Sequence, residues 1–354
     1  MGSPENPQIT PRPSRYRRVG LALSVLALAG LVVFALSRLN LPRAGHALIT
    51  ATPGWIALAF LLMACSLVLR SISWQQTLRA ALPDSLIPRP TVIRATMIGV
   101  MASAVFPGRI GEPSRVLVLT RRIEGSNRRL LPIIAGTVFS QTLINLLALA
   151  ILAGVTFTSV PLLHGHASGI LTAVVVPLAI CALVLLGPRL LALAQRSRST
   201  RIVRAANTVE GALRLARRGL IVFARPRYGA GAVASQLAAW ALQWLACYMV
   251  LLSLGLQSQA GLVSAAAILL AVNVSAILPA TPSNVGVFQA ACLVVLAAYG
   301  VGAGPGLAYG IILQAVEVLT ALALGIPAAL GENLSWSELR SGREEVEGST
   351  GEGA

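Results

Sequence analysis

Long apolar runs recur along most of this chain and constrain its fold more than any other feature. A hydrocarbon layer of about 30 Å needs roughly 20 helical residues, so a run of that length crosses it once. Runs of this kind cover about 19–38, 54–72, 130–157, 169–193, 229–254 and 306–330. The sequence therefore predicts an all-α polytopic integral membrane protein with about six spanning helices.

The charge pattern fits a membrane protein better than a nucleic-acid-binding one. The formal net charge is +16, but only 11% of residues are charged, 56% are hydrophobic and the mean hydropathy is +0.77. All basic residues are Arg, and nearly all lie between the apolar runs. In such positions they act as orientation signals and lipid-phosphate contacts, so we expect no nucleic-acid partner.

Two further apolar regions, 91–120 and 261–300, are each broken in the middle by Pro and Gly. Their halves are too short to span alone, so they are interpreted as helical hairpins that enter the membrane and return. The alternative is two ordinary kinked spanning pairs. As re-entrant hairpins they point at each other from opposite faces, in an inverted-repeat-like arrangement typical of transporters.

The distribution of Arg along the chain sets its expected orientation and organisation. With the first four Arg in the cytoplasm, both termini are cytoplasmic, and the Ala- and Arg-rich composition suggests a bacterial plasma membrane. The segment 194–228 is a basic amphipathic helix on the inner leaflet or a solvated linker. The predicted parts are a basic N-terminus (1–18), a first membrane half (19–193), this linker (194–228), a second half (229–330) and an acidic disordered tail (331–354).

The first break places two Arg and a carboxylate at a hairpin tip. Charges at that depth cost at least about 2.5 kcal/mol each on insertion scales, so we expect them to pair or to face a wet cavity. Arg109 and Arg115 are candidates for binding a lipid phosphate, with Glu112 positioning one of them. The alternative is an internal salt bridge that only neutralises the tip. The candidate substrate-binding residues here are Pro107, Gly108, Arg109, Gly111, Glu112 and Arg115.

The second break carries prolines and neutral polar residues. Irregular backbone at membrane depth is tolerated only where protein or water satisfies it, so these residues are expected to line a polar cavity. A purely structural hinge is the alternative. The candidates are Asn273, Pro279, Thr281, Pro282, Ser283, Asn284, Gly286 and Gln289.

The last span carries Gln314 and, one turn later, Glu317. An intramembrane carboxylate is a functional candidate, as an Arg partner or a proton carrier, against the alternative of a structural ion pair. His164 and His166 lack a third ligand nearby, so we expect no metal site. With no cofactor motif or nucleophile signature either, we expect no cofactor and no enzyme.

At these breaks the sequence resembles the flippase-like family defined by the transmembrane region of lysylphosphatidylglycerol synthase, the multiple peptide resistance factor. Its Pro-Gly-Arg-hydrophobic-Gly-Glu motif and following Arg match Pro107 to Glu112 and Arg115. Its Thr-Pro-Gly-Gly-hydrophobic-Gly-hydrophobic-x-Glu motif is matched partly by Thr281, Pro282, Gly286 and Val287.

The chain departs from this pattern in its second half. Ser283 and Asn284 stand for Gly-Gly, Gln289 stands for the Glu, and the last span has Gln314 and Glu317 where an Arg is common. The soluble aminoacyl-transferase domain of the bifunctional synthases has no counterpart. The resemblance implies lipid handling without lipid synthesis.

Two hypotheses of function follow. The first is a flippase-like protein that binds and translocates a phosphate-bearing lipid or lipid-linked precursor, its partner being an anionic phospholipid or a polyprenyl-phosphate-linked one. The second is a non-transporting membrane partner that positions a glycosyltransferase or lipid-modifying enzyme through the 194–228 segment.

Overall fold

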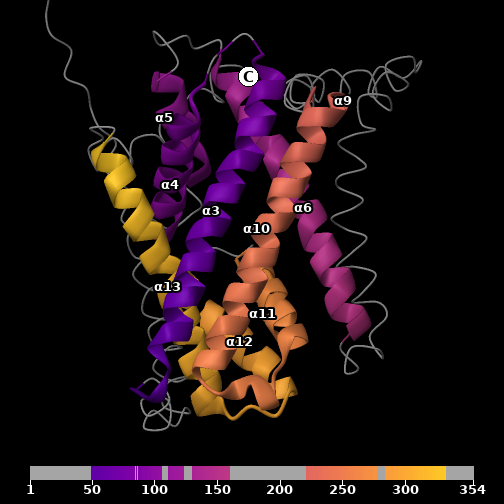
Figure 1. Cartoon of the computed structure of the whole chain (residues 1–354), viewed down its shortest axis with the longest axis vertical. Coiled ribbons are helices and arrows are strands. Elements are labelled where there is room, and N and C mark those ends of the chain that lie inside the picture. Colours follow the sequence, from indigo (N-terminus) through magenta and orange to yellow (C-terminus); the bar gives the residue numbers. More distant parts are fainter. Residues whose placement is uncertain are drawn as a thin grey trace, which may run out of the picture.

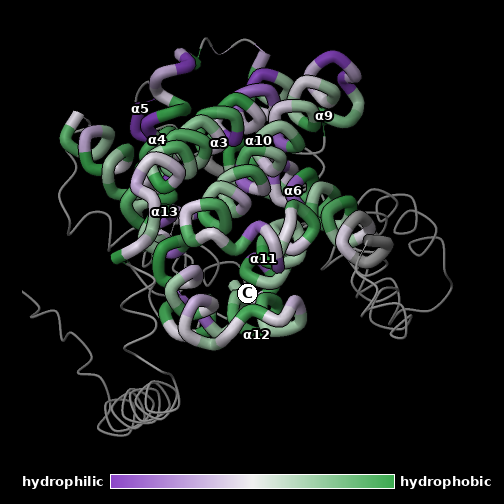
Figure 2. The backbone as a smooth tube through the Cα atoms, turned by 60° about the horizontal axis from the view of Figure 1, so that its bottom comes forward, coloured by the Kyte–Doolittle hydropathy of each residue, from purple (hydrophilic) through white to green (hydrophobic). Residues whose placement is uncertain are grey.

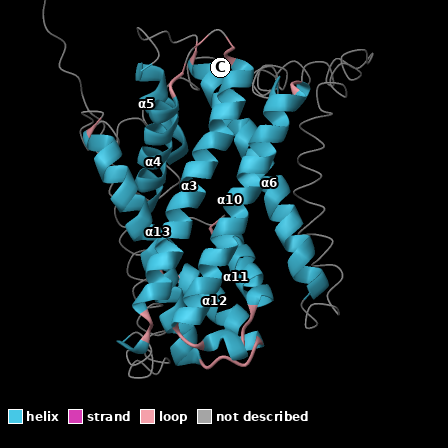
Figure 3. Ribbon diagram, viewed as in Figure 1, coloured by secondary structure: helices cyan, strands magenta, loops and turns pink. Residues whose placement is uncertain are grey.

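The computed structural model describes residues 49–83, 85, 87–105, 111–122, 130–159, 221–276 and 284–331. Within these ranges all regular secondary structure is helical, and no strand occurs (Figure 3). The predicted runs 19–38 and 169–193 lie outside the described residues, as do the N-terminus (1–18), most of the linker and the tail after Gly331.

Four helices are long and apolar enough to cross a membrane: α3 (Pro53–Ala81), α6 (Leu131–Ser159), α10 (Pro226–Ser253) and α13 (Ala303–Leu330). They confirm the four predicted runs that the structure describes, and the chain is a multi-pass membrane protein. Both α3 and α10 begin with a proline. Its missing N–H costs nothing at this position, because the first backbone N–H groups of a helix have no partner within the helix.

The helix α3 continues past its predicted end at 72 to Ala81. Arg70, near the end of the predicted run, and Arg79, beyond it, are therefore both helical residues. Arg70 lies several turns inside α3, where it faces other helices of the bundle.

Two pairs of short helices occupy the broken regions. The first pair is α4 (Arg89–Val105) with α5 (Gly111–Arg122), and the second is α11 (Leu262–Ser275) with α12 (Val287–Ala298). All four are shorter than the roughly 20 residues that a crossing needs. The pairs lie at opposite ends of the bundle, α4–α5 at the top and α11–α12 at the bottom (Figure 1).

The described helices form two similar sets. Each set consists of a long helix, a short hairpin and a second long helix: α3, α4, α5, α6 and then α10, α11, α12, α13. In Figure 1 α3 rises towards its hairpin, whereas α10 descends towards its own. The α3 and α10 helices pack along each other, with the turns α9 (Ile221–Ala224) and η2 (Leu256–Ser258) at the two ends of α10. This order and direction agree with the predicted inverted-repeat-like arrangement.

Each hairpin has its own apolar core. Residues such as Trp74, Ile98 and Leu119 surround the first, whereas Val250, Ile268 and Tyr309 belong to the cluster around the second. The long helix α13 contacts α12 near its start and α4 further along, so it links both hairpins. In Figure 2 hydrophobic residues cover the long helices, and hydrophilic ones gather at the ends near α5 and α9.

Glycines allow the helices of the first hairpin to approach closely, as small residues do in membrane bundles. A Cβ atom on Gly99 of α4 would lie 2.7 Å from the carbonyl oxygen of Gly111, and one on Gly111 would collide with the carbonyl of Gly99 and the hydroxyl of Ser103. Gly325 of α13 sits equally close to the Met101 side chain of α4. The contacts of Gly99 and Gly111 hold α4 against α5, and the contact of Gly325 holds α4 against α13.

Candidate functional site

The first turn of α5 carries the charges of the first hairpin. Arg115 and Glu112 form an ion pair across one helical turn, as their spacing predicts. The Arg115 side chain is only 10% exposed, whereas that of Glu112 is 53% exposed. Glu112 also lies in the helix's first turn, where a negative charge complements the helix dipole. The internal salt bridge considered above is thus present, and its buried partner is the guanidinium.

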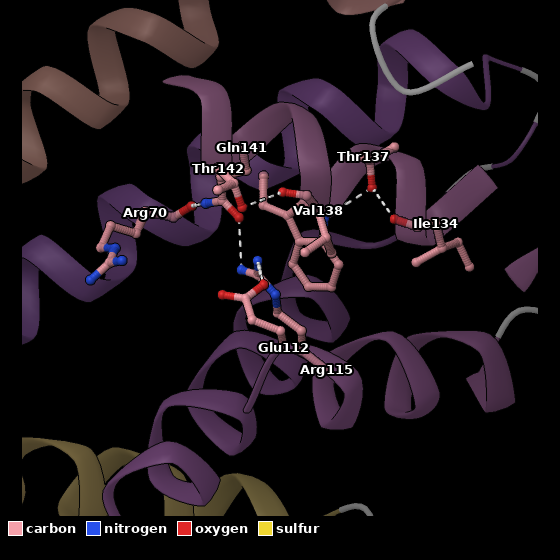
Figure 4. A network of polar contacts seen from close by, with 9 residues as sticks. Arg70, Glu112, Arg115, Ile134, Thr137, Val138, Gln141 and Thr142 are labelled. Atoms are coloured by element: carbon pink, nitrogen blue, oxygen red, sulfur yellow. Dashed lines mark hydrogen bonds and ion pairs between the residues drawn. The ribbon is translucent and has the colours of Figure 1, made fainter. Parts of the chain in front are cut away.

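Two more groups hold Arg115 in place, one of them fixed in turn by a third. Its Nη1 donates a 2.7 Å hydrogen bond to Oε1 of Gln141 on α6, and its guanidinium carbon lies 4.9 Å from the ring centre of Trp74 on α3. The Trp74 indole donates in turn to the hydroxyl of Thr137, 3.1 Å away. Figure 4 shows Glu112 and Arg115 reaching from the hairpin towards Gln141. Arg115 therefore anchors the hairpin tip to α3 and α6.

Arg70 of α3 lies beside this network but is bound differently. The Gln141 amide donates to the backbone carbonyl of Arg70, 2.9 Å away, so the side chain is left out of this contact (Figure 4). Within the described residues the Arg70 guanidinium makes no hydrogen bond or ion pair. It lies within Coulombic range of Arg115, Glu112 and Glu317 and is half-buried. A guanidinium with unused donors inside a membrane bundle is suited to bind an anion.

The second polar group belongs to α12 and α13. The side-chain NH2 group of Gln289 donates to Oε1 of Gln314. The side-chain oxygen Oε1 of Gln289 accepts a hydrogen bond from the backbone N–H of Gly286, 2.6 Å away. Two positions where the chain departs from the family pattern are therefore in direct contact, and both are neutral amides. Close approach is possible because Gly310 leaves a Cβ position only 3.1 Å from the Gln289 Cα.

The backbone before α12 turns sharply. Asn284 has a φ of 54° and Gly286 a φ of 90°, the left-handed region that favours Asn and Gly. The Asn284 amide donates to the carbonyl of Ser275 at the end of α11, 3.2 Å away. This contact closes the second hairpin, so Asn284 has a structural part there.

Glu317 connects the two polar groups. It lies on α13 one turn after Gln314 and interacts through its charge with Arg70 on α3. Hence the predicted residues Glu112 and Arg115 belong to one polar cluster and Gln289 and Gln314 to a second, with Arg70 and the predicted residue Glu317 between them.

Other predicted site residues lie apart or outside the described ranges. Asn273 donates to the carbonyl of Leu269 one turn earlier on its own helix, 2.8 Å away, and is not part of either cluster. Seven candidates lie outside the described residues: Pro107, Gly108, Arg109, Pro279, Thr281, Pro282 and Ser283.

Sequence reasoning missed several participants. Arg70 lay near the end of the predicted run 54–72 and was not a candidate site residue, and Gln141 lay unremarked in an apolar run. On α6 the polar residues Thr137, Gln141 and Asn145 recur every four positions, which places them on one helix face. That spacing is a signal that the run 130–157 carries on its own.

The comparison with known families agrees with this geometry. The family described as the lysylphosphatidylglycerol synthase TM region matches residues 19–325, nearly the whole chain. The chain belongs to this family. Among curated proteins no relative matches it. Membership in the lysylphosphatidylglycerol synthase TM region family gives the chain a lipid-related membrane function, and its polar clusters are the candidate place for it.

Proposed function

We propose that this protein is a flippase-like transporter that binds a phosphate-bearing lipid, or a lipid-linked precursor, between the two hairpins and moves its headgroup across the membrane. The observation that carries the proposal is Arg70. Its guanidinium has no hydrogen-bond partner within the described residues, although it lies inside a spanning helix next to three other charges.

The division of labour between the two Arg supports a phosphate ligand. Arg115 is buried, and its two terminal nitrogens already bond Gln141 and Glu112 while its guanidinium lies over the Trp74 face; its buried Nε makes no hydrogen bond within the described residues. Arg70 keeps its donors for a ligand, and guanidinium forks match phosphate oxygens well. The sequence-based hypothesis gave phosphate binding to Arg109 and Arg115; Arg109 lies outside the described residues, and here the phosphate is assigned to Arg70, with Arg115 as a positioning residue.

Charge balance suggests how binding reaches both hairpins. The four charges are two cations and two carboxylates, Arg70 and Arg115 against Glu112 and Glu317. A phosphate at Arg70 competes with Glu317 for that cation and so weakens the attraction between α3 and α13. Because α13 contacts α4 of the first hairpin and α12 of the second, a movement of α13 changes the packing of both hairpins.

The test is lipid translocation in reconstituted vesicles, with a tail-labelled phosphatidylglycerol whose outer-leaflet fraction is bleached by dithionite. A charge-assisted hydrogen bond is worth about 1.5–3 kcal/mol, so Arg70→Gln should slow transport by roughly 10- to 100-fold. Arg122→Gln, an exposed position in the last turn of α5, is the matched control and should transport normally. An Arg70→Gln protein that stays monodisperse and transports at the normal rate contradicts the proposal.

The alternative function, a non-transporting partner of a glycosyltransferase or lipid-modifying enzyme, draws on the basic segment 194–228. Most of that segment lies outside the described residues. The polar clusters inside the bundle favour the transport hypothesis, because a docking protein has no need of charges at that depth.

A further inference from the structure

A separate cluster of amides lies between α6 and α10. Asn145 sits in the middle of α6, and its Oδ1 accepts two hydrogen bonds from α10: from Nε2 of Gln236 at 2.8 Å and from Nε1 of Trp240 at 3.0 Å. The Gln236 side chain is buried, with the residue 1% exposed, and Trp240 is 7% exposed. Neither the sequence motifs nor the proposed phosphate site includes these residues.

The orientation of both amides is fixed by chemistry. An indole N–H only donates, so the atom of Asn145 that faces Trp240 must be the oxygen. That oxygen in turn requires the NH2 group of Gln236, which turns the Gln236 oxygen away. Swapping either amide end for end would set two donors or two acceptors against each other.

Two hydrogen-bonding groups are consequently left over. The Gln236 Oε1 is fully buried and accepts from no donor, and the Asn145 Nδ2 donates to no acceptor, in both instances within the described part of the chain. Buried polar groups without partners are rare in native structures and call for an explanation. A free acceptor and a free donor on two amides that are hydrogen-bonded to each other are complementary to a hydroxyl group, which donates one hydrogen bond and accepts others.

The position of the cluster relates it to the phosphate site. Asn145 follows Gln141 by four residues on the same face of α6, a distance of about one helical pitch of 5.4 Å. Gln141 bonds both Arg115 and the Arg70 backbone. The Arg70 backbone and the amides therefore lie about one helical turn apart along α6, in the same part of the bundle.

We infer that Asn145 and Gln236, oriented by Trp240, form a subsite for a hydroxyl of the lipid headgroup. The inference rests on the proposed function and narrows it to phosphodiester lipids with a polyol headgroup, either glycerol-like or sugar-like. Asn145 is partly exposed and makes the first contact, and Gln236 completes the site as α6 and α10 separate during transport.

The experiment measures lipid selectivity of the purified full-length protein by native mass spectrometry in mixed micelles. Phosphatidylglycerol and phosphatidylinositol carry hydroxyls of the two kinds, and phosphatidylpropanol has the same charge without them. One net hydrogen bond corresponds to about a three- to tenfold preference, which we expect for one of the two hydroxylated lipids over phosphatidylpropanol. Which of them is preferred distinguishes a glycerol-like from a sugar-like headgroup.

Variants assign the preference to the amides. Gln236→Leu keeps the side-chain volume and removes the acceptor. The ratio of binding of the hydroxylated lipid to binding of phosphatidylpropanol should therefore fall to near one. Gln243→Leu, on the same helix face two turns later, is the matched control and should keep it. Trp240→Phe offers a second, mild variant that only frees Asn145 to rotate, with partial loss expected.

Equal binding of all three lipids by the unchanged protein overturns the subsite, as does a preference that survives in both Gln236→Leu and Trp240→Phe. The two proposals fail separately. If Arg70→Gln weakens binding of every lipid while Gln236→Leu leaves selectivity intact, the phosphate site stands and the hydroxyl subsite is wrong. If Gln236→Leu abolishes the selectivity while Arg70→Gln leaves the binding of every lipid unchanged, the hydroxyl subsite stands and the phosphate site is wrong.

Discussion

Replacing Arg115 tests how the first hairpin is held in the bundle. Arg115→Ala removes the ion pair with Glu112, the hydrogen bond to Gln141 and the contact with the Trp74 face. The ion pair is screened at its half-exposed carboxylate and contributes about 0–1 kcal/mol. The charged hydrogen bond contributes about 1.5–3 kcal/mol and the cation–π contact about 0.5–2 kcal/mol.

Hydrogen bonds in bilayers average only about 0.6 kcal/mol, so the lower half of each range applies. We therefore expect Arg115→Ala to lower the free energy of unfolding by about 2–4 kcal/mol. Arg115→Lys keeps the charge but loses the planar fork, and should cost about half as much.

The measurement is reversible unfolding in mixed micelles by titration with dodecyl sulfate. Arg122→Ala, exposed in the same helix, is the control and should change the free energy by no more than about 0.5 kcal/mol. A double-mutant cycle with Gln141→Leu isolates the hydrogen bond and should give a coupling of about 1 kcal/mol or more. The anchoring role of Arg115 would be refuted if Arg115→Ala lowered the free energy of unfolding no more than Arg122→Ala does, and if the effects of Arg115→Ala and Gln141→Leu were additive.

Three further predictions concern the backbone and the turn after α12. Gly111→Ala should destabilise the protein by about 1–3 kcal/mol because its Cβ collides with α4, whereas Gly154→Ala, with open space around it, should stabilise α6 by about 0.5–1 kcal/mol; both are read in the same unfolding assay. Asn284→Ala should cost about 1–2 kcal/mol, and Asn284→Gly less, because Gly tolerates the positive φ; equal losses would mean that the hydrogen bond alone matters. Burial raises the pKa of Tyr299, so the folded state holds that proton more tightly and stability should fall as pH rises above about 10. Tyr299→Phe should remove that alkaline decline, seen as melting temperature against pH, and an unchanged decline would assign it to another group.

The layout of the bundle was readable from the sequence because it follows from length and breaks. The runs that became α6, α10 and α13 have nearly the predicted bounds, and Pro and Gly marked the two hairpins. The end of α3 was predicted too early, at 72, because the apolar run ends there although the helix continues past Arg79 to Ala81. An Arg inside a helix remains helical when other helices supply its environment, and no local pattern reveals that.

The candidate site was partly predictable for a similar reason. The spacing of Glu112 and Arg115 fixed their pairing, since residues three apart share a helix face. Trp74 and Gln141, which contact Arg115, come from α3 and α6, far away in sequence, so only the packed bundle shows that Arg115 is held by side-chain contacts whereas the Arg70 guanidinium makes no hydrogen bond within the described residues. The amides of Asn145 and Gln236 were equally hidden, because each is a single polar residue in an apolar run.

The central claim is that Arg70 holds the phosphate of a lipid inside the bundle. The most direct measurement is solid-state NMR dipolar recoupling between 31P of bound lipid and 15N in the arginine guanidinium groups, in reconstituted protein, compared with Arg70→Lys and Arg122→Lys. The account predicts a strong phosphorus–nitrogen coupling that Arg70→Lys abolishes and Arg122→Lys leaves unchanged. A coupling that persists in Arg70→Lys, or is absent from the unchanged protein with lipid bound, would contradict it.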